Sequence, residues 1–391
     1  MATRLDLAPD LAIWQGDVRD ALRQMPDSSV QCVVTSPPYL GLRDYGVAGQ
    51  IGLEPTVEEY VAVMVEVFRE VRRVLRKDGT LWLNIGDSYT SGDRTWRAPD
   101  KKNQARAMSI RPDTPEGLKP KDLIGVPWRL AFALQQDGWY LRSDIIWHKP
   151  NAMPESVKDR PTRSHEYIFL LSKSASYYYD ADAIREPSAW DPSKTKFPDG
   201  WDTGPGGHGS FHRAGREKGR KNDASGSTAA YGRNKRSVWT IPTQPFPEAH
   251  FATFPEELPR LCILAGTSPY ACPHCGAPWR RVLQKVAVDN PASYKGSSFT
   301  KGKTAEPKSN VGQGPRYERG GTVGWEPTCS CEANDGSGRC IVLDPFWGSG
   351  TTGQVALQYG RIAWGVELNP EYIEISKRRL CRTQTTLIGR L

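Results

Sequence analysis

The stretch IVLDPFWGSGTT (residues 341–352) combines an apolar strand, a tight glycine turn and the start of a helix. Its glycines, Gly348 and Gly350, let a ligand approach the backbone, and the helix N-terminus favours a negatively charged group. Residues 362–366 then predict a second strand ending at Glu367, an acid placed to bind ribose hydroxyls. This succession predicts part of an open α/β sheet. The two closely set glycines after Asp-Pro-Phe differ from the dinucleotide fingerprint.

A second stretch, VVTSPPY (residues 33–39), lies far upstream. Residues 30–35 predict a buried strand that the two prolines end abruptly. Ser36 and Tyr39 then follow its carboxyl end, where open α/β sheets place their chemistry. A hydroxyl, backbone carbonyls and a flat ring suit a planar group with an exocyclic amine. Taken alone, the stretch is also compatible with an ordinary proline-terminated strand.

The segments between these stretches fit the same kind of sheet. A capping box at Thr56 and Glu59 opens a helical period that ends at residues 77–79, and residues 80–85 predict the next strand. A further helix and two further strands are predicted at residues 127–136, 139–147 and 166–171. Gly16-Asp17 follows a short strand, where Asp17 suits either an N-cap or a contact to a ribose or an adenine amine.

Composition limits the function classes. The 391 residues have a formal net charge of +8 and a pI of about 9, which favours a polyanionic partner. We expect a cytoplasmic protein without a membrane segment, because no secretory pattern or membrane-length apolar run occurs.

The middle of the chain changes character. Residues 187–240 hold nine glycines and ten Lys and Arg against five Asp and Glu, with aromatic residues scattered among the charges. Such a mixture suits phosphate neutralisation together with base or sugar contacts, and it equally suits a flexible basic linker. If the chain binds DNA, sequence recognition is expected here.

Closely spaced cysteines form a third pattern. Cys272-Pro-His-Cys275-Gly is a tight knuckle, and Cys329-Ser-Cys331 is a second one about fifty residues later. Paired short-spaced cysteines predict a structural four-thiolate zinc site rather than a disulfide framework, with Cys340 or His274 as replacement ligands. Free thiols in a loop are the less favoured interpretation.

Together, the first two stretches resemble the motifs of the DNA amino-methyltransferases, in the permuted arrangement usually called the beta group. There the catalytic motif precedes the target-recognition region, and the S-adenosylmethionine motif follows. The resemblance covers nearly the whole chain. Its departures are the cysteine-bearing insertion at 270–335 and a long polar loop near 90–120.

The resemblance implies a circularly permuted, doubly wound, mainly parallel α/β sheet in a Rossmann-like fold that binds S-adenosylmethionine. Residues 1–186 would form the catalytic half, 187–248 the target-recognition region and 249–391 the cofactor half. The two halves must meet along one sheet, with Asp344 and Ser36 at the ends of neighbouring strands.

The same resemblance implies the site residues. The catalytic loop would be Ser36, Pro37, Pro38 and Tyr39. The predicted cofactor contacts are Asp17 at the adenine, Phe254 near the methionine end, Glu367 at the ribose, and the turn residues Asp344, Pro345, Phe346, Gly348, Gly350 and Thr351. The predicted metal ligands remain Cys272, Cys275, Cys329 and Cys331.

The implied reaction is methylation of an exocyclic amine on a base rotated out of double-stranded DNA. In the family a serine at the first loop position leans towards cytosine N4 and an aspartate towards adenine N6. Ser36 therefore predicts cytosine N4, with adenine N6 as the alternative. Methylation of a ring carbon is disfavoured, because that chemistry needs a thiolate and no Pro-Cys dipeptide occurs.

Interpretations from other classes remain at this stage. One is a non-catalytic DNA-binding zinc module, against which the intact Ser36, Tyr39, Asp344 and Glu367 count. Another is a small-molecule methyltransferase, and a weaker one is methylation of RNA or of a protein glutamine. The resemblance also raises a companion restriction endonuclease as a partner.

Overall fold

The computed structural model describes residues 1–42, 46–90, 114, 117–187, 232–244, 254–288 and 316–388. The polar loop near 90–120 therefore lies mostly outside the described residues, as do residues 188–231 of the predicted recognition region. The chain divides into two compact units: residues 1–184, 236–280 and 327–391, and residues 185–235 and 281–326.

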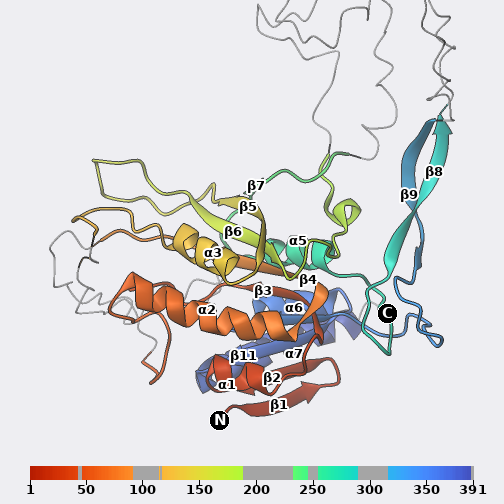
Figure 1. The fold of residues 1–391 in the computed structure, drawn as a ribbon, viewed down its shortest axis with the longest axis horizontal. Coiled ribbons are helices and arrows are strands. Elements are labelled where there is room, and N and C mark those ends of the chain that lie inside the picture. Colours follow the sequence, from red (N-terminus) through yellow and green to blue (C-terminus); the bar gives the residue numbers. More distant parts are fainter. Residues whose placement is uncertain are drawn as a thin grey trace, which may run out of the picture. The chain divides into compact units, whose positions relative to one another are not determined.

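The first unit is built on a nine-stranded mixed sheet, with strand order β1-β2-β11-β10-β3-β4-β6-β5-β7 (Figure 1). The pairs β2–β11, β11–β10, β10–β3, β3–β4 and β5–β7 are parallel, whereas β1–β2, β4–β6 and β5–β6 are antiparallel. The strands are β1 (Thr3–Ala8), β2 (Leu11–Gln15), β3 (Val30–Thr35), β4 (Leu75–Ile85), β5 (Tyr140–His148), β6 (His165–Ser172), β7 (Val238–Thr240), β10 (Ile341–Asp344) and β11 (Ile362–Glu367).

Helices cover both faces of this sheet. The helices are α1 (Val18–Arg23), α2 (Val57–Val74), α3 (Val126–Gln136), α5 (Glu257–Gly266), α6 (Thr351–Gln358) and α7 (Pro370–Ile388), with a 3₁₀ turn at Ala181–Ile184. The predicted cap of α2 is present, because Thr56 Oγ1 accepts a hydrogen bond from the Glu59 amide (3.2 Å).

Alternating side chains of the strands feed two separate cores. On β3 beyond the irregularity at Val30, Val33 packs with residues of α1, α2 and α3, while Cys32 and Val34 pack with residues of α5, α6 and α7. This period-two division is what a central strand buried on both faces requires. The result is the predicted doubly wound sheet, and β10 and β3 are neighbours in it as predicted.

The structure also departs from the sequence-based elements. β4 begins at Leu75 directly after α2, so residues 77–79 lie within the strand and not at the end of the helix. β1 and the strands of the second unit carry no clear sequence pattern. β7 comes from the predicted recognition region 187–248, yet it pairs with β5 in the main sheet.

The second unit is described only in part. It contains a two-stranded sheet of β8 (Arg280–Val288) and β9 (Arg316–Glu326). The Arg281 guanidinium lies over the Trp325 ring (4.5 Å to its centroid) and donates to Thr322 Oγ1 (2.7 Å).

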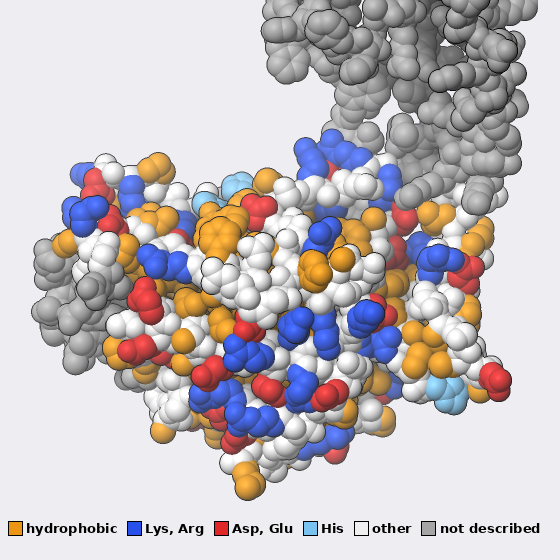
Figure 2. All heavy atoms as spheres, in the orientation of Figure 1, with side chains coloured by type: hydrophobic (Ala, Val, Ile, Leu, Met, Phe, Trp, Pro, Cys, Tyr) orange, Lys and Arg blue, Asp and Glu red, His pale blue; other side chains and the backbone are white. Residues whose placement is uncertain are grey.

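No helix in the described ranges is long and apolar enough to cross a bilayer. On the face drawn in Figure 2, Lys and Arg side chains are interspersed with Asp and Glu. That face of the described residues is therefore a mixed charged surface and not a continuous basic patch.

Candidate active site

A cavity of about 1550 Å³ lies at the carboxyl ends of the parallel strands of the nine-stranded sheet. Its walls come from the carboxyl ends of β2, β3, β4, β5, β10 and β11 and from the start of the antiparallel β6. Typical small-molecule pockets span about 300–1,000 Å³. The cavity is therefore large enough for two ligands side by side, such as a nucleoside-sized cofactor and a nucleotide.

The predicted catalytic loop lines this cavity. Ser36, Pro37, Pro38 and Tyr39 all contribute to its wall. The Pro38 carbonyl accepts a hydrogen bond from Tyr60 Oη on α2 (2.8 Å), which fixes the loop from behind. Gly86 lies against the Tyr39 ring so closely that an added Cβ would come within 2.7 Å of Cε2.

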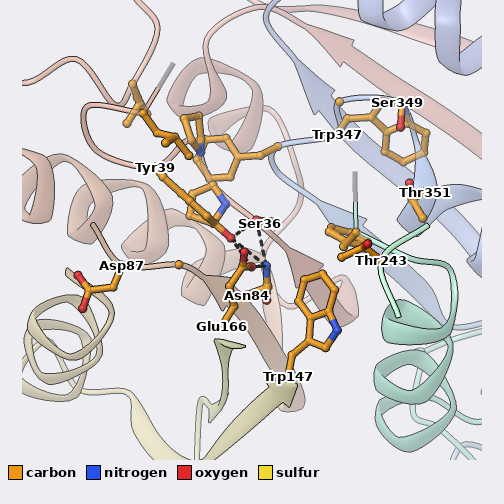
Figure 3. Close-up of a pocket in the computed structure, with 18 of the residues that line it drawn as sticks. Ser36, Tyr39, Asn84, Asp87, Trp147, Glu166, Thr243, Trp347, Ser349 and Thr351 are labelled. Carbon is orange, nitrogen blue, oxygen red and sulfur yellow. Dashed lines mark hydrogen bonds between the residues drawn. The ribbon is translucent and has the colours of Figure 1, made fainter. Parts of the chain in front are cut away.

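Ser36 and Tyr39 belong to a polar network that sequence reasoning did not foresee (Figure 3). Ser36 Oγ lies 3.3 Å from Tyr39 Oη, which in turn donates to Glu166 Oε2 (2.8 Å). Asn84 Nδ2 lies at the centre, within hydrogen-bonding distance of all three, at 3.3 Å from Ser36 Oγ, 3.0 Å from Tyr39 Oη and 3.0 Å from Glu166 Oε2.

The charge of Glu166 is compensated from the neighbouring strand. Lys149, just after β5, donates to Glu166 Oε1, and its ammonium also lies 4.3 Å from the centroid of the Trp147 ring. Burial and the Glu166 charge raise the pKa of the Tyr39 phenol well above 10. Tyr39 is thus held as a neutral hydroxyl that both accepts and donates.

The glycine turn, residues 345–350 between β10 and α6, forms another wall of the cavity. Pro345, Phe346, Gly348 and Thr351 line the cavity, as does Phe254 ahead of α5. Gly348 has a φ of +51° and nothing lies within 4 Å of an added Cβ, so its backbone borders open space. Gly350 has a φ of +77° and is the N-cap of α6, but it is not among the lining residues.

Glu367, at the end of β11, also lines the cavity. Its carboxylate accepts hydrogen bonds from the backbone amides of Gly348 (2.7 Å) and Asn369 (2.8 Å). Burial raises its pKa to about 7, against these hydrogen bonds. The acid therefore joins the glycine turn to the next strand end.

Asp17 has the N-cap role predicted for it, and its contact to a ribose or an adenine amine stays a prediction. It is the N-cap of α1, accepting from the Arg19 amide (2.8 Å), and it lines the cavity. Partial burial opposes ionisation, but hydrogen bonds from Arg19 hold the pKa of Asp17 below its usual value.

Asp344 occupies a different place. It is 1% exposed and is not a lining residue. Its Oδ1 accepts from Thr35 Oγ1 (2.7 Å) and from the Phe346 amide (3.0 Å), and its Oδ2 from Thr352 Oγ1 (2.8 Å). The carboxyl therefore connects the end of β3, the glycine turn and the first turn of α6 from beneath.

Arg379 of α7 supports the glycine turn from behind. It donates to Ser349 Oγ (3.1 Å) and Thr351 Oγ1 (2.8 Å), and its charge is met by Glu256 (3.2 Å). Ser349 and Thr351 line the cavity, so Arg379 fixes two side chains of its wall.

The mouth of the cavity carries exposed apolar residues. Met153 is 73% exposed, and Leu42 and Val157 are also exposed while lining the cavity. Arg160 lines the cavity as well and stacks over the Tyr89 ring (3.8 Å to its centroid).

Sequence reasoning missed Asn84, Lys149, Glu166 and Arg379. For Asn84 a sequence signal exists. It is a polar residue near the end of an apolar strand beside β3, so it is expected at the same strand ends as Ser36. Glu166 has no such signal, because it begins an antiparallel strand and its distance from Tyr39 depends on sheet order. The four predicted metal ligands lie together elsewhere, near the start of β3, at the end of the strand away from the cavity.

Comparison with known proteins assigns this architecture. A family model described as DNA methylase (N6_N4_Mtase) matches residues 30–272 and 334–378. The chain belongs to this N6/N4 DNA methylase family. This DNA methylase is accordingly an S-adenosylmethionine-dependent methyltransferase. The segment between the two matched ranges carries three of the four predicted metal ligands.

Relatives of the methylase are similar over most of their length. The Type II methyltransferase M.Cfr9I of Citrobacter freundii is 46% identical over 376 residues, covering 96% of this chain and 89% of the relative. The Type II methyltransferase M.SmaI of Serratia marcescens is 46% identical over 367 residues, covering 94% and 89%.

A solved structure gives the same fold. The PvuII DNA methyltransferase (cytosine-N4-specific) superposes with a TM-score of 0.53 at 16% identity, covering 95% of this chain and 86% of that one. The predicted Rossmann-like methyltransferase fold is thereby confirmed.

The residues of the cavity fit S-adenosylmethionine. The open space at Gly348, the carboxylate of Glu367 and the carboxylate of Asp17 provide backbone access and acceptors for a ribose and an amine. Phe254 and Phe346 add apolar surface to the same walls.

Proposed function

We propose that this methylase transfers a methyl group to the N4 amine of cytosine in double-stranded DNA, as the modification enzyme of a Type II restriction–modification system. The observation that carries the choice of base is Ser36, which occupies the first position of the catalytic loop and lines the cavity. The 46% identical relatives named Type II methyltransferases support this biological setting. A companion endonuclease is part of the proposal.

The catalytic loop holds the target amine in this proposal. Ser36 Oγ and the Pro37 carbonyl accept its two N–H bonds, since Tyr60 already occupies the Pro38 carbonyl. Two acceptors in these positions draw the nitrogen lone pair out of conjugation with the ring. The Tyr39 ring then packs on the base, and the rate gain comes from positioning and electrostatics.

The cofactor wall consists of the glycine turn, Phe254, Glu367 and Asp17. In this proposal Glu367 binds the ribose hydroxyls and Asp17 binds the adenine amine. When bound there, S-adenosylmethionine supplies an electrophilic methyl group. Asp344 and Arg379 act on this wall from behind, as positioning residues.

The proton released by the methylated amine needs an acceptor, and the network provides one. Ser36 Oγ takes this proton as its own proton passes to Tyr39 Oη, and the Tyr39 proton passes to the Glu166 carboxylate. Asn84 Nδ2 can only donate to these groups, so the two hydroxyl protons are left to point in this one direction. Charge is conserved along the chain: the amine becomes neutral and Glu166 becomes a carboxylic acid.

The mouth of the cavity suits DNA. Exposed apolar side chains such as Met153 and Leu42 can contact bases beside the site from which a nucleotide is rotated. Arg160 beside them can meet the phosphate backbone. These contacts place the substrate without specifying its sequence.

The deciding experiment uses S-adenosylmethionine with a labelled methyl group and unmodified mixed-sequence duplex DNA. After digestion to nucleosides and chromatographic separation with mass analysis, we expect the label in N4-methylcytosine. Reactions without DNA, and with the enzyme heated beforehand, serve as controls.

Each other outcome would change the proposal. Label in N6-methyladenine alone would keep the mechanism and reject the role given to Ser36 in choosing the base. Tight DNA binding with no transfer at any cofactor concentration would favour the non-catalytic binding module. Transfer to small amines without DNA would reject the DNA substrate.

A further inference from the structure

The cysteines of the inserted segment come together in space. The sulfurs of Cys272, Cys275, Cys329 and Cys331 all lie within 4.8 Å of one another. Four thiolates at about 2.3 Å from a tetrahedral Zn²⁺ would lie about 3.8 Å apart. The cluster therefore has the size of a four-thiolate metal site, assembled from two segments more than fifty residues apart in the chain.

The first segment already has the backbone of a metal-binding knuckle. The Gly276 amide donates to the Cys272 carbonyl (2.9 Å) and the Cys272 amide to the Ala277 carbonyl (2.9 Å). Gly276 has a φ of +67°, which favours glycine and turns the chain back.

The second segment is organised around the same sulfurs. Asn334 Nδ2 donates to Cys329 Sγ (3.3 Å), and Asn334 Oδ1 accepts from Trp279 Nε1 (3.0 Å). Thr328 Oγ1 donates to the Pro278 carbonyl (2.6 Å). Hydrogen bonds of Thr328 and Asn334, on either side of the second cysteine pair in the chain, thus join the two segments without a metal.

The two replacement ligands considered from the sequence, His274 and Cys340, lie outside the four-sulfur cluster. His274 is exposed, and its Nε2 contacts the Ala333 carbonyl (3.2 Å). Cys340 is buried and lies outside the four-sulfur group found among the described residues. All seven cysteines with described side chains carry free thiols, so no disulfide among them accounts for the cluster.

The knuckle is attached to the sheet at the end away from the cavity. Gln31, 4% exposed at the start of β3, donates from Nε2 to the Gly276 carbonyl (2.8 Å) and accepts at Oε1 from the Ile341 amide (2.5 Å). Arg76, at the start of β4, donates to the Cys275 carbonyl. Ser36 follows the other end of β3, so about five residues of strand, roughly 17 Å, separate Gln31 from Ser36.

We propose that Cys272, Cys275, Cys329 and Cys331 bind one Zn²⁺ as a structural site. The ion joins the two ends of the inserted segment, on either side of residues 276–328, and fixes the knuckle that Gln31 and Arg76 hold at the starts of β3 and β4. Four thiolates leave no open coordination position, which excludes a bound water and a direct part in methyl transfer. The inference stands independently of the base that is methylated.

The test measures metal content and thiol reactivity of the full-length protein purified without chelators. Elemental analysis is expected to give about one zinc per chain, and titration with an organomercurial to release that zinc as four thiols react. Replacement by Co²⁺ is expected to give the intense d–d absorption of a tetrahedral thiolate site. Neither measurement depends on methyl transfer.

Variants then identify the ligands. Cys329→Ser and Cys331→Ser are expected to bind zinc substoichiometrically and to unfold at a lower temperature, whereas His274→Ala in the same knuckle keeps a full complement. Full zinc retention in the Cys329→Ser, Cys331→Ser double variant would overturn the proposal. So would iron in place of zinc, a disulfide found by alkylation under non-reducing conditions, or a wild-type protein that neither contains zinc nor yields the Co²⁺ spectrum.

Discussion

Replacing Glu166 with glutamine is expected to lower kcat for methyl transfer by about 10²–10⁴-fold, the usual contribution of a positioned proton acceptor. Glutamine keeps the shape of the side chain and an oxygen that accepts from Tyr39 Oη, now 2.8 Å away. It cannot take up the proton that the relay delivers. The KM values for DNA and cofactor are expected to remain close to wild type, because Glu166 contacts neither ligand in the proposal. The free energy of unfolding is expected to fall, because Lys149 loses its charged partner.

The measurement is single-turnover methyl transfer across pH, with urea unfolding as a check on the fold. If the relay operates, the Glu166→Gln rate rises with pH as solvent takes over as acceptor. Glu70→Gln is the matched control: Glu70 is also bonded to a basic side chain (2.9 Å to Arg73) but lies on α2, away from the cavity. A Glu166→Gln variant as fast as this control would refute the relay.

Tyr39→Phe provides the second arm of the test. It keeps the ring for the base and removes only the hydroxyl between Ser36 and Glu166. Because groups that act in series are not additive, the double variant is expected to be no slower than either single variant. Additive losses would indicate two separate structural roles instead of one proton path.

The sequence is sufficient for the parts of the site that follow strand ends directly. Ser36 and Glu367 lie on the cavity wall as predicted, because a buried strand and its end residue can be recognised locally. The neighbourhood of β3 and β10 follows from the permuted order of the motifs.

The relay could not be predicted in the same way. Glu166 and Ser36 are brought together only because β6 runs antiparallel beside β4 and brings its first residues to the edge where β3 and β4 end. Pairing direction at the far side of a sheet is a tertiary property with no local pattern. The same limit applies to Gln31, whose role depends on a knuckle 245 residues away.

For Asp344 the sequence predicted more than the structure shows. Its motif position predicts a ligand contact, whereas its carboxyl is buried beneath the cavity wall. Replacing Asp344 with alanine is expected to lower the free energy of unfolding by roughly 2–5 kcal/mol, since Thr35 Oγ1 and the Phe346 amide would lose their acceptor in the interior. Thr352 Oγ1 loses less, because the Val34 carbonyl lies 3.2 Å away as a second acceptor. Urea denaturation at pH 7 measures the difference.

The substitution Asp344→Asn is expected to be tolerated, and the reason lies in Thr352. The side-chain oxygen of the introduced asparagine can accept from Thr35 and the Phe346 amide. Its NH₂ group donates to Thr352 Oγ1, and that hydroxyl donates to the Val34 carbonyl. A protonated Asp344 would use the same arrangement. An Asp344→Asn variant as unstable as Asp344→Ala would contradict this account.

The pH dependence of the free energy of unfolding distinguishes a protonated from an ionised Asp344. Burial raises the pKa of Asp344 from 3.8 to about 7, against hydrogen bonds from Thr35, Thr352 and Phe346. Between these values the unfolded chain ionises while the folded chain keeps its proton, so the free energy of unfolding falls as pH rises and levels off above about 7. An asparagine side chain does not titrate, so the stability of Asp344→Asn relative to wild type is expected to increase from pH 4 to pH 7. Glu367, whose pKa is also raised to about 7, remains in both proteins and largely cancels from the comparison. A relative stability that does not change with pH would mean that Asp344 is already ionised in the folded state at acid pH.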